Sequence, residues 1–250
     1  MMKSLPTTFK ILVREFLDAA GYVWGWMKCR KFHVLFALLF AAAAAYLASC
    51  LDGQVIALVQ ETNAVDKDLP KVADVVSYYG DFLGFNLFLF AALMLGCWWF
   101  RSVKLLRLAV ATLICASLAG LTANVLRVAT GRPRPSVKVE DGFYGPSLKS
   151  RFQAFPSAHT ATAMGAALPL LQSSHPLVGV PTTLVAVAVA WSRIQLNRHH
   201  LSDVLFSTMI AFIYSWPVSM WVLRRPRRWR QSTDPNAAKD QPLPEHALQS

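Results

Sequence analysis

The chain has 250 residues, of which 54% are hydrophobic and only 16% are charged. A soluble domain of this length carries more charge and lacks repeated apolar runs, so the composition excludes an ordinary soluble enzyme and favours an integral membrane protein. The formal net charge of +11 does not indicate nucleic-acid binding, because the basic residues flank apolar segments instead of forming a soluble patch. The four cysteines lack metal-ligand spacing and predict no disulfide framework.

Residues 1–31 are mixed in character and form the first predicted unit. Between Phe9 and Leu17, apolar residues recur at helical spacing with charged residues between them. This pattern predicts an amphipathic helix lying on the membrane surface, although a cytosolic packing helix fits it too. A basic cluster, Lys28 to Lys31, ends the unit.

Residues 32–223 predict an all-α membrane domain of six spanning helices. The expected spans are roughly residues 32–50, 82–100, 108–126, 157–171, 177–191 and 201–223. The more polar stretch 52–79 is expected to be a loop with a short helix. The first span ends in Leu-Ala-Ser-Cys at Cys50, which also resembles a lipoprotein cleavage box, but a retained span is favoured.

Six spans place both termini on one side of the membrane, together with the basic clusters at residues 28–31, 101–107 and 224–230. The positive-inside rule makes this side cytoplasmic, in what we expect to be a bacterial inner membrane. Residues 224–250 then form a basic and afterwards disordered cytoplasmic tail. The loop at 127–155 lies on the outer, periplasmic face, where its basic residues are unexpected unless they hold an anion.

The first of three polar clusters ends the third predicted span and runs from Arg127 to Pro135. Its prolines stop the helix and stiffen the turn. Arg127, Arg132 and Arg134 suit a cage that binds a phosphate through paired N–H groups. A basic cluster that contacts lipid headgroups is the alternative interpretation.

The second cluster, residues 155–159, opens the fourth predicted span. Backbone N–H groups at a helix start favour an anion, and Ser157 can cap the helix or bind an oxygen. His159, one turn into the helix, can protonate a leaving oxygen. A histidine that simply lies at the membrane interface fits the same position.

The third cluster, residues 191–203, joins the last two predicted spans. His199 and Asp203 are four residues apart, so they share one face of a helix that starts near His199. A carboxylate that accepts from one imidazole nitrogen leaves the other nitrogen as a nucleophile or base. His200 has no acid at the equivalent position, and Arg193 adds a planar charge suited to a phosphoryl group. The alternative is an ordinary polar loop.

Together, the three clusters resemble the type-2 phosphatidic acid phosphatase superfamily, which includes bacterial acid phosphatases and vanadium haloperoxidases. That family's pattern is K-x6-R-P, then P-S-G-H, then S-R-x5-H-x3-D. Arg127 stands at the lysine position, Arg134-Pro135 match the R-P pair, and residues 156–159 match the second motif with Ala158 in place of glycine. Ser192-Arg193, His199 and Asp203 match the third motif in full. The resemblance covers roughly residues 80–220.

The resemblance implies phosphate ester hydrolysis without a metal ion or other cofactor. His199 would attack phosphorus and form a phosphohistidine, with Asp203 holding its other nitrogen. His159 would protonate the leaving group and then activate water. The groups expected to stabilise the phosphoryl oxygens are Arg127, Arg134, Arg193, Ser157 and the Ala158 N–H, with Arg132 as a weaker addition.

The apolar spans favour a lipid phosphate that lies in the bilayer as the substrate. Candidates are undecaprenyl diphosphate, the 1-phosphate of lipid A, phosphatidylglycerophosphate and phosphatidate, and the sequence selects none of them and no oligomeric state. Two alternatives are a vanadate-dependent haloperoxidase-like enzyme and a non-catalytic membrane protein that binds phospholipid headgroups. The six spans disfavour the first alternative, and the intact His–Asp pair disfavours the second.

Overall fold

The computed structural model describes residues 5–80 and 82–224, and this part of the chain is helical without a strand. The predicted all-α fold is therefore confirmed. The α-helices are α1 (Leu5–Cys29), α2 (Lys31–Val65), α3 (Leu69–Tyr79), α4 (Leu87–Phe100), α5 (Val103–Thr130), α6 (Ala158–Ser173), α7 (Pro176–Gln195) and α8 (Leu201–Leu223). A π-turn, η1 (Phe82–Asn86), precedes α4, and a 3-10 turn, η2 (Ser150–Phe152), lies in the long loop. The predicted tail at residues 225–250 lies outside the described residues.

Five helical segments are long and apolar enough to cross a membrane: α2, Leu83–Phe100, α5, α7 and α8. The remaining helix of the bundle, α6, has 16 residues, which makes it about 24 Å long against a hydrocarbon core of about 30 Å. Most of its residues are buried among its neighbours. The count of six spans therefore stays a prediction.

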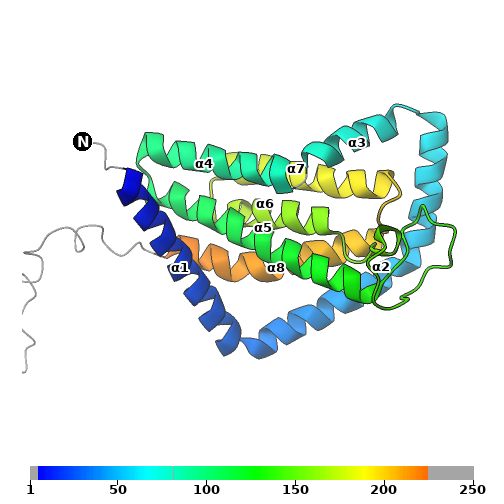
Figure 1. Cartoon of the computed structure of the whole chain (residues 1–250), viewed down its shortest axis with the longest axis horizontal. Coiled ribbons are helices and arrows are strands. Elements are labelled where there is room, and N and C mark those ends of the chain that lie inside the picture. The colour runs from blue at the N-terminus through cyan, green and yellow to red at the C-terminus, as the bar shows by residue number, and fades with distance from the viewer. Residues whose placement is uncertain (1–4, 81, 225–250) are drawn as a thin grey trace, which may run out of the picture.

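Helices α5, α6, α7 and α8 lie roughly parallel or antiparallel and form the centre of the molecule (Figure 1). Helices α5 and α6 approach closely because small residues line their contact. A Cβ atom at Gly165 would lie 2.7 Å from the carbonyl oxygen of Cys115. Such close approach is typical of membrane helices, which pack by van der Waals contact where lipid removes most of the hydrophobic driving force. This contact holds the middle of α6 against the middle of α5.

Helix α2 corrects the expectation of a loop at residues 52–79. It continues without interruption through Asp52 to Val65, and α3 follows after a short turn. At 35 residues it is about 52 Å long, well beyond the thickness of a bilayer core. In Figure 1 its first part runs beside α8, and its last part turns across the end of the bundle. The polar residues of this stretch misled the prediction, because one of them, Asp52, is buried by tertiary contacts.

Different segments of the chain lie at the two ends of the bundle. The start of α1, the turn between α4 and α5 and the end of α8 lie at one end, whereas the loop at 131–157 and the start of α8 lie at the other (Figure 1). Helix α1 is tied to its end by Arg107, whose Nε donates to Glu15 at 2.9 Å, and by Trp221, whose Nε1 donates to Asp18 at 2.9 Å. That helix α1 lies on the membrane surface stays a prediction.

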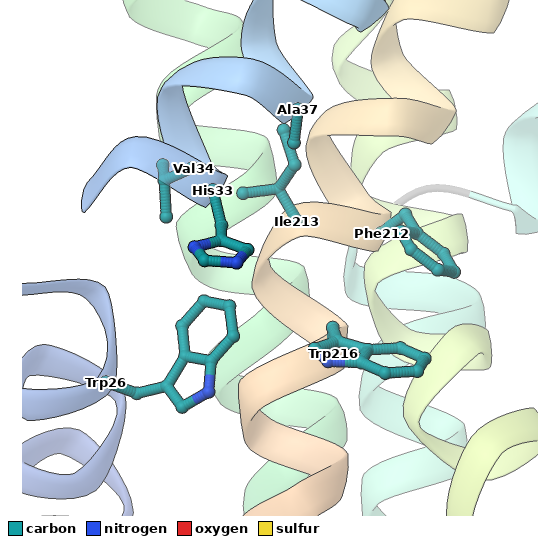
Figure 2. A pocket seen from close by; sticks show the side chains of 7 residues that line it. All are labelled: Trp26, His33, Val34, Ala37, Phe212, Ile213 and Trp216. Atoms are coloured by element: carbon teal, nitrogen blue, oxygen red, sulfur yellow. The ribbon is translucent and has the colours of Figure 1, made fainter. Parts of the chain in front are cut away.

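An apolar cavity of about 260 Å³ opens between α1, α2 and α8 (Figure 2). The side chains that line it are Trp26, His33, Val34, Ala37, Phe212, Ile213 and Trp216. None of them is a predicted site residue, and the lining contains no arginine or lysine. The cavity is therefore separate from the candidate phosphate site.

Candidate active site

The long loop after α5 begins at a glycine that the backbone requires. Gly131 ends the helix in a left-handed conformation with φ +60°, and a Cβ atom there would lie 1.9 Å from the carbonyl oxygen of Gly145. Only glycine fits such a position without strain. The turn directs the following residues, including Arg132, back over the end of the bundle.

Backbone hydrogen bonds then hold this loop against its surroundings, although it contains only one short 3-10 turn. The Arg134 N–H donates to the carbonyl of Arg151 at 2.9 Å, and the Ala154 N–H donates to the carbonyl of Arg132 at 3.0 Å. The Ser136 N–H crosses to the third motif and donates to the carbonyl of Asn197 at 3.2 Å. The first and third motifs are therefore part of one connected surface.

Three of the predicted arginines, Arg127, Arg134 and Arg193, form what we call the arginine cage. In each, the Nε atom is buried and has no hydrogen-bond partner within the described residues. Burial lowers the pKa of Arg134, and the charges of Arg198 and Arg127 lower it further. The charges of Arg134, Arg198 and Arg127 repel Arg193, and together they outweigh the attraction of Asp74. Guanidinium groups gathered in this way suit an anion with several oxygens.

Arg193 itself is held by a residue that the sequence did not indicate. Its side chain is 8% exposed, and its Nη1 donates to the Ser77 hydroxyl of α3. Ser77 is buried because α3 packs against α7. Helix α3 thus positions one wall of the arginine cage, and no local sequence pattern could have revealed this contact.

His199 lies in the turn between α7 and α8, with a side chain that is only 3% exposed. Its Nδ1 is 2.6 Å from the carbonyl oxygen of Ala154 and 3.8 Å from Oδ2 of Asp203. A carbonyl can only accept, so Nδ1 carries the proton and Nε2 keeps its lone pair. Burial lowers the pKa of His199, although the nearby carboxylate of Asp203 and the hydrogen bond to Ala154 act against this. The imidazole ring is therefore neutral near neutral pH.

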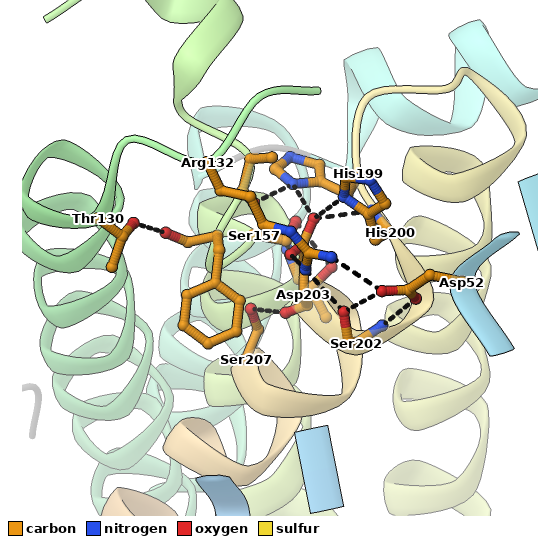
Figure 3. A network of polar contacts seen from close by, with 12 residues as sticks. Asp52, Thr130, Arg132, Ser157, His199, His200, Ser202, Asp203 and Ser207 are labelled. Carbon is orange, nitrogen blue, oxygen red and sulfur yellow. Dashed lines mark hydrogen bonds and ion pairs between the residues drawn. The ribbon is translucent and has the colours of Figure 1, made fainter. Parts of the chain in front are cut away.

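Arg132 and His200 lie closer to the carboxylate of Asp203 than His199 does. Its Oδ1 accepts from Arg132 at 2.6 Å, and its Oδ2 accepts from the His200 N–H at 2.7 Å (Figure 3). Nδ1 of His200 lies 3.1 Å from the same oxygen. His200 precedes α8 and Asp203 lies in its first turn, so the pair caps the helix start. The sequence argument paired Asp203 with His199, whereas the shorter contacts are to His200.

Arg132 lies apart from the arginine cage. Its guanidinium donates to Asp141 at 2.6 and 2.8 Å, to Asp203 at 2.6 Å, to Ser202 at 2.7 Å and to Asp52 at 3.0 Å. Burial by itself lowers the pKa of Arg132, but the hydrogen bond to Asp141 and the charges of Asp203 and Asp141 raise it above its usual value. Its donors are taken up by carboxylates and a hydroxyl. We therefore treat Arg132 as a support for Asp203 instead of a phosphate ligand.

The second motif forms the start of α6. Ser157 is fully buried and caps this helix, since its hydroxyl oxygen accepts from the N–H and the hydroxyl of Thr160 at 3.4 and 3.0 Å. Ala158 is the first helical residue and is 7% exposed, whereas His159 is only partly buried. Figure 3 places Ser157 beside Arg132, His199 and Asp203. The end of the bundle thus brings parts of all three motifs together.

The described residues contain no group of three or more His, Cys, Asp or Glu side chains that could hold a metal ion. Their contacts therefore assign no metal ligand.

The fold and site define an all-helical membrane protein with a buried histidine beside a cluster of arginines. A family model for the PAP2 superfamily matches residues 104–227, which contain all three motifs. The family prediction is thereby confirmed, and residues 104–227 form a region of the PAP2 superfamily.

The structure is also similar to the crystal structure of a transmembrane PAP2-type phosphatidylglycerolphosphate phosphatase from Bacillus subtilis, with a TM-score of 0.55. The two sequences are 20% identical, and the match covers 78% of this chain and 98% of that one. At this identity the likeness concerns the fold, and together with the apolar helices it supports an integral membrane protein. No curated protein matches the chain.

Proposed function

We propose that this protein is an integral-membrane phosphatase that hydrolyses a phosphate monoester or diphosphate of a lipid. The observation that carries the proposal is the arginine cage beside the buried ring of His199. The three guanidinium groups are buried or half-buried, and none forms an ion pair with a carboxylate of the described residues. Such like charges repel one another, and a phosphoryl group would remove this repulsion. The apolar helices argue that the substrate lies in the bilayer, because a soluble ester would not need them.

In the proposed reaction, Nε2 of His199 attacks phosphorus as the bond to the leaving oxygen breaks, which forms a phosphohistidine. The carbonyl of Ala154 holds the Nδ1 proton at 2.6 Å and thereby selects the nucleophilic tautomer. The phosphorylated ring is cationic at this stage. Asp203, 3.8 Å from Nδ1, stabilises that charge.

His159 supplies the proton that the leaving oxygen takes up, and in the second step it accepts a proton from the water that hydrolyses the phosphohistidine. The oxygens of the transferred group carry the developing negative charge and are stabilised by preorganised donors. We assign this role to Arg127, Arg134, Arg193, Ser157 and the backbone N–H of Ala158.

For this function we propose a topology in which the active site faces the periplasmic side of a bacterial inner membrane. The basic residues near the turn between α4 and α5, and Arg224 at the end of α8, lie at the opposite end of the bundle from the site. The positive-inside rule makes that end cytoplasmic. Both termini would then be cytoplasmic, and the substrate would be a lipid phosphate of the outer leaflet.

The test is phosphate release from four lipids by the purified protein in detergent or nanodiscs. The panel consists of undecaprenyl diphosphate, lipid A 1-phosphate, phosphatidylglycerophosphate and phosphatidate. We expect the wild type to act on at least one of them, whereas His199→Ala and His159→Ala lose turnover and remain in the membrane. His175→Ala, which changes the exposed histidine that precedes α7, is the matched control and should stay active. Turnover by His199→Ala at the wild-type rate would exclude the assignment.

A further inference from the structure

Asp52 is a buried acid in an otherwise apolar part of α2. It lies outside the three motifs and outside the stretch that matches the PAP2 superfamily. Its residue is only 4% exposed. A carboxylate in a membrane helix is costly unless it is paired, and such residues usually serve a function. Its partners therefore indicate what it does.

Both oxygens of Asp52 are engaged by residues next to Asp203. Oδ1 accepts from the Ser202 N–H at 3.0 Å, and Oδ2 accepts from the Ser202 hydroxyl at 2.5 Å (Figure 3). Oδ2 also accepts from Nη2 of Arg132 at 3.0 Å. The other nitrogen of that guanidinium, Nη1, donates to Asp203 at 2.6 Å. A single guanidinium thus connects Asp52 to Asp203.

The charges around His199 are separated in space. The arginine cage carries several positive charges, and none of them is paired with a carboxylate in the part of the chain that the structure describes. Arg132, in contrast, is shared by Asp52, Asp141 and Asp203, so this second group has an excess of negative charge. We call Asp52, Arg132, Asp141 and Asp203 the acidic cluster. An imidazole between the two groups gains a positive charge when it is phosphorylated, and the excess negative charge of the acidic cluster stabilises it.

We propose that Asp52 is a positioning residue for the phosphatase reaction, acting through Arg132 and Ser202 to hold Asp203 and to keep negative charge beside the His199 ring. This inference rests on the proposed function, since it assigns Asp52 a part in the same reaction. It extends the functional unit beyond the three motifs to α2.

An alternative role for Asp52 is simply to attach α2 to the bundle, but this role would not require a charged side chain. The end of α2 is already tied to α7 by Asn63 and Gln195, which exchange neutral hydrogen bonds at 2.6 and 3.2 Å. An amide at position 52 could accept from Ser202 in the same way. The negative charge of Asp52 adds the pairing with Arg132, and this charge is the property to be tested.

The decisive variant is Asp52→Asn, which keeps the size and one acceptor but removes the charge. We expect kcat on the preferred lipid phosphate to fall by about tenfold to a hundredfold, the effect of losing one hydrogen bond between charged groups. KM should change by less than about threefold, because no cage arginine is altered and ground-state binding is retained. Asp68→Asn is the matched control. It makes the same change on an exposed acid next to α3 and should keep the wild-type kcat.

A second variant, Ser202→Ala, removes the hydroxyl that donates to Asp52 from the α8 side. It tests the same network if Asp52→Asn fails to fold. If both residues act through one network, the double variant should lose much less than the product of the two single losses. A kcat of Asp52→Asn within about twofold of wild type, a loss confined to KM, or fully multiplicative losses would each overturn the inference. Absence of wild-type turnover on every lipid would instead reject the proposed function.

Discussion

The division of the arginines into two groups predicts that one of two neighbouring substitutions destabilises the protein and the other does not. Arg132→Met removes the cation shared by Asp52 and Asp203, whose side chains are 5% and 0% exposed. Two buried carboxylates are then left without their cation. Breaking a buried ion pair in this way costs about 3–5 kcal/mol, which corresponds to a fall in Tm of roughly 6–20 °C for a chain of this length.

Arg134→Met removes a cation that has cationic neighbours and no ion-pair partner among the acids that the structure describes. The half-buried guanidinium is repelled by Arg127 and Arg198, and its Nε is buried without a partner among the described residues. Its removal should leave the free energy of unfolding unchanged or raise it by up to about 1 kcal/mol, the range for partly exposed charge interactions. Phosphate binding should nevertheless be lost.

The assay is thermal unfolding in one detergent at constant ionic strength, with and without inorganic phosphate. At a phosphate concentration ten times Kd, binding stabilises the wild type by about 1.4 kcal/mol, or roughly 3–6 °C in Tm. Arg134→Met should show the wild-type Tm or a higher one and no response to phosphate. If Arg132→Met and Arg134→Met lost the same stability, the separation of the arginine cage from the acidic cluster would be refuted.

Three further predictions concern the nucleophile and the loop. Because burial holds the pKa of His199 below its ordinary value of 6.5, its neutral form persists into mildly acidic solution, and the acid limb of the pH profile of kcat/KM should have its midpoint below 6.5. A midpoint above this value would contradict a buried neutral nucleophile. Stability should also decrease in acid, because His199 of the unfolded chain binds a proton more readily than the buried His199 of the folded protein. Tm should therefore fall as pH drops below about 6.5. Gly131→Ala should destabilise the protein and lower kcat. The added methyl group would be strained at φ +60° and would lie 1.9 Å from the carbonyl oxygen of Gly145. The backbone strain alone costs about 1–2 kcal/mol. Gly145→Ala is the matched control, with φ +84° and no atom within 4 Å of the added Cβ, and equal losses in Tm for the two variants would contradict the role of the clash.

Much of the fold could be predicted from the sequence, because helices in a membrane are encoded locally. An apolar run of sufficient length must satisfy its backbone hydrogen bonds internally, so it forms a helix wherever it lies. This is why α4, α5, α7 and α8 agree with the predicted spans within a few residues. The three motifs could be recognised for a similar reason, since their spacing is a property of the chain itself.

The prediction failed where long-range contacts decide the structure. A polar residue after an apolar run predicts the end of a helix, but Asp52 is buried against Ser202, 150 positions away in the chain, and α2 continues to Val65. Helix length depends here on a partner that no local pattern reveals.

The partners within each motif were also decided by the tertiary structure. Arg132 and Arg134 are two positions apart and chemically identical, yet one meets three carboxylates and the other meets arginines. In the same way, Asp203 approaches His200 more closely than His199. The sequence by itself determined that a histidine, an acid and several arginines meet at one end of a helical membrane bundle. Which of them touch depends on the course of the loop after Gly131 and on the packing of α2 against α8, because a shift of one residue along a turn sends a side chain in a different direction.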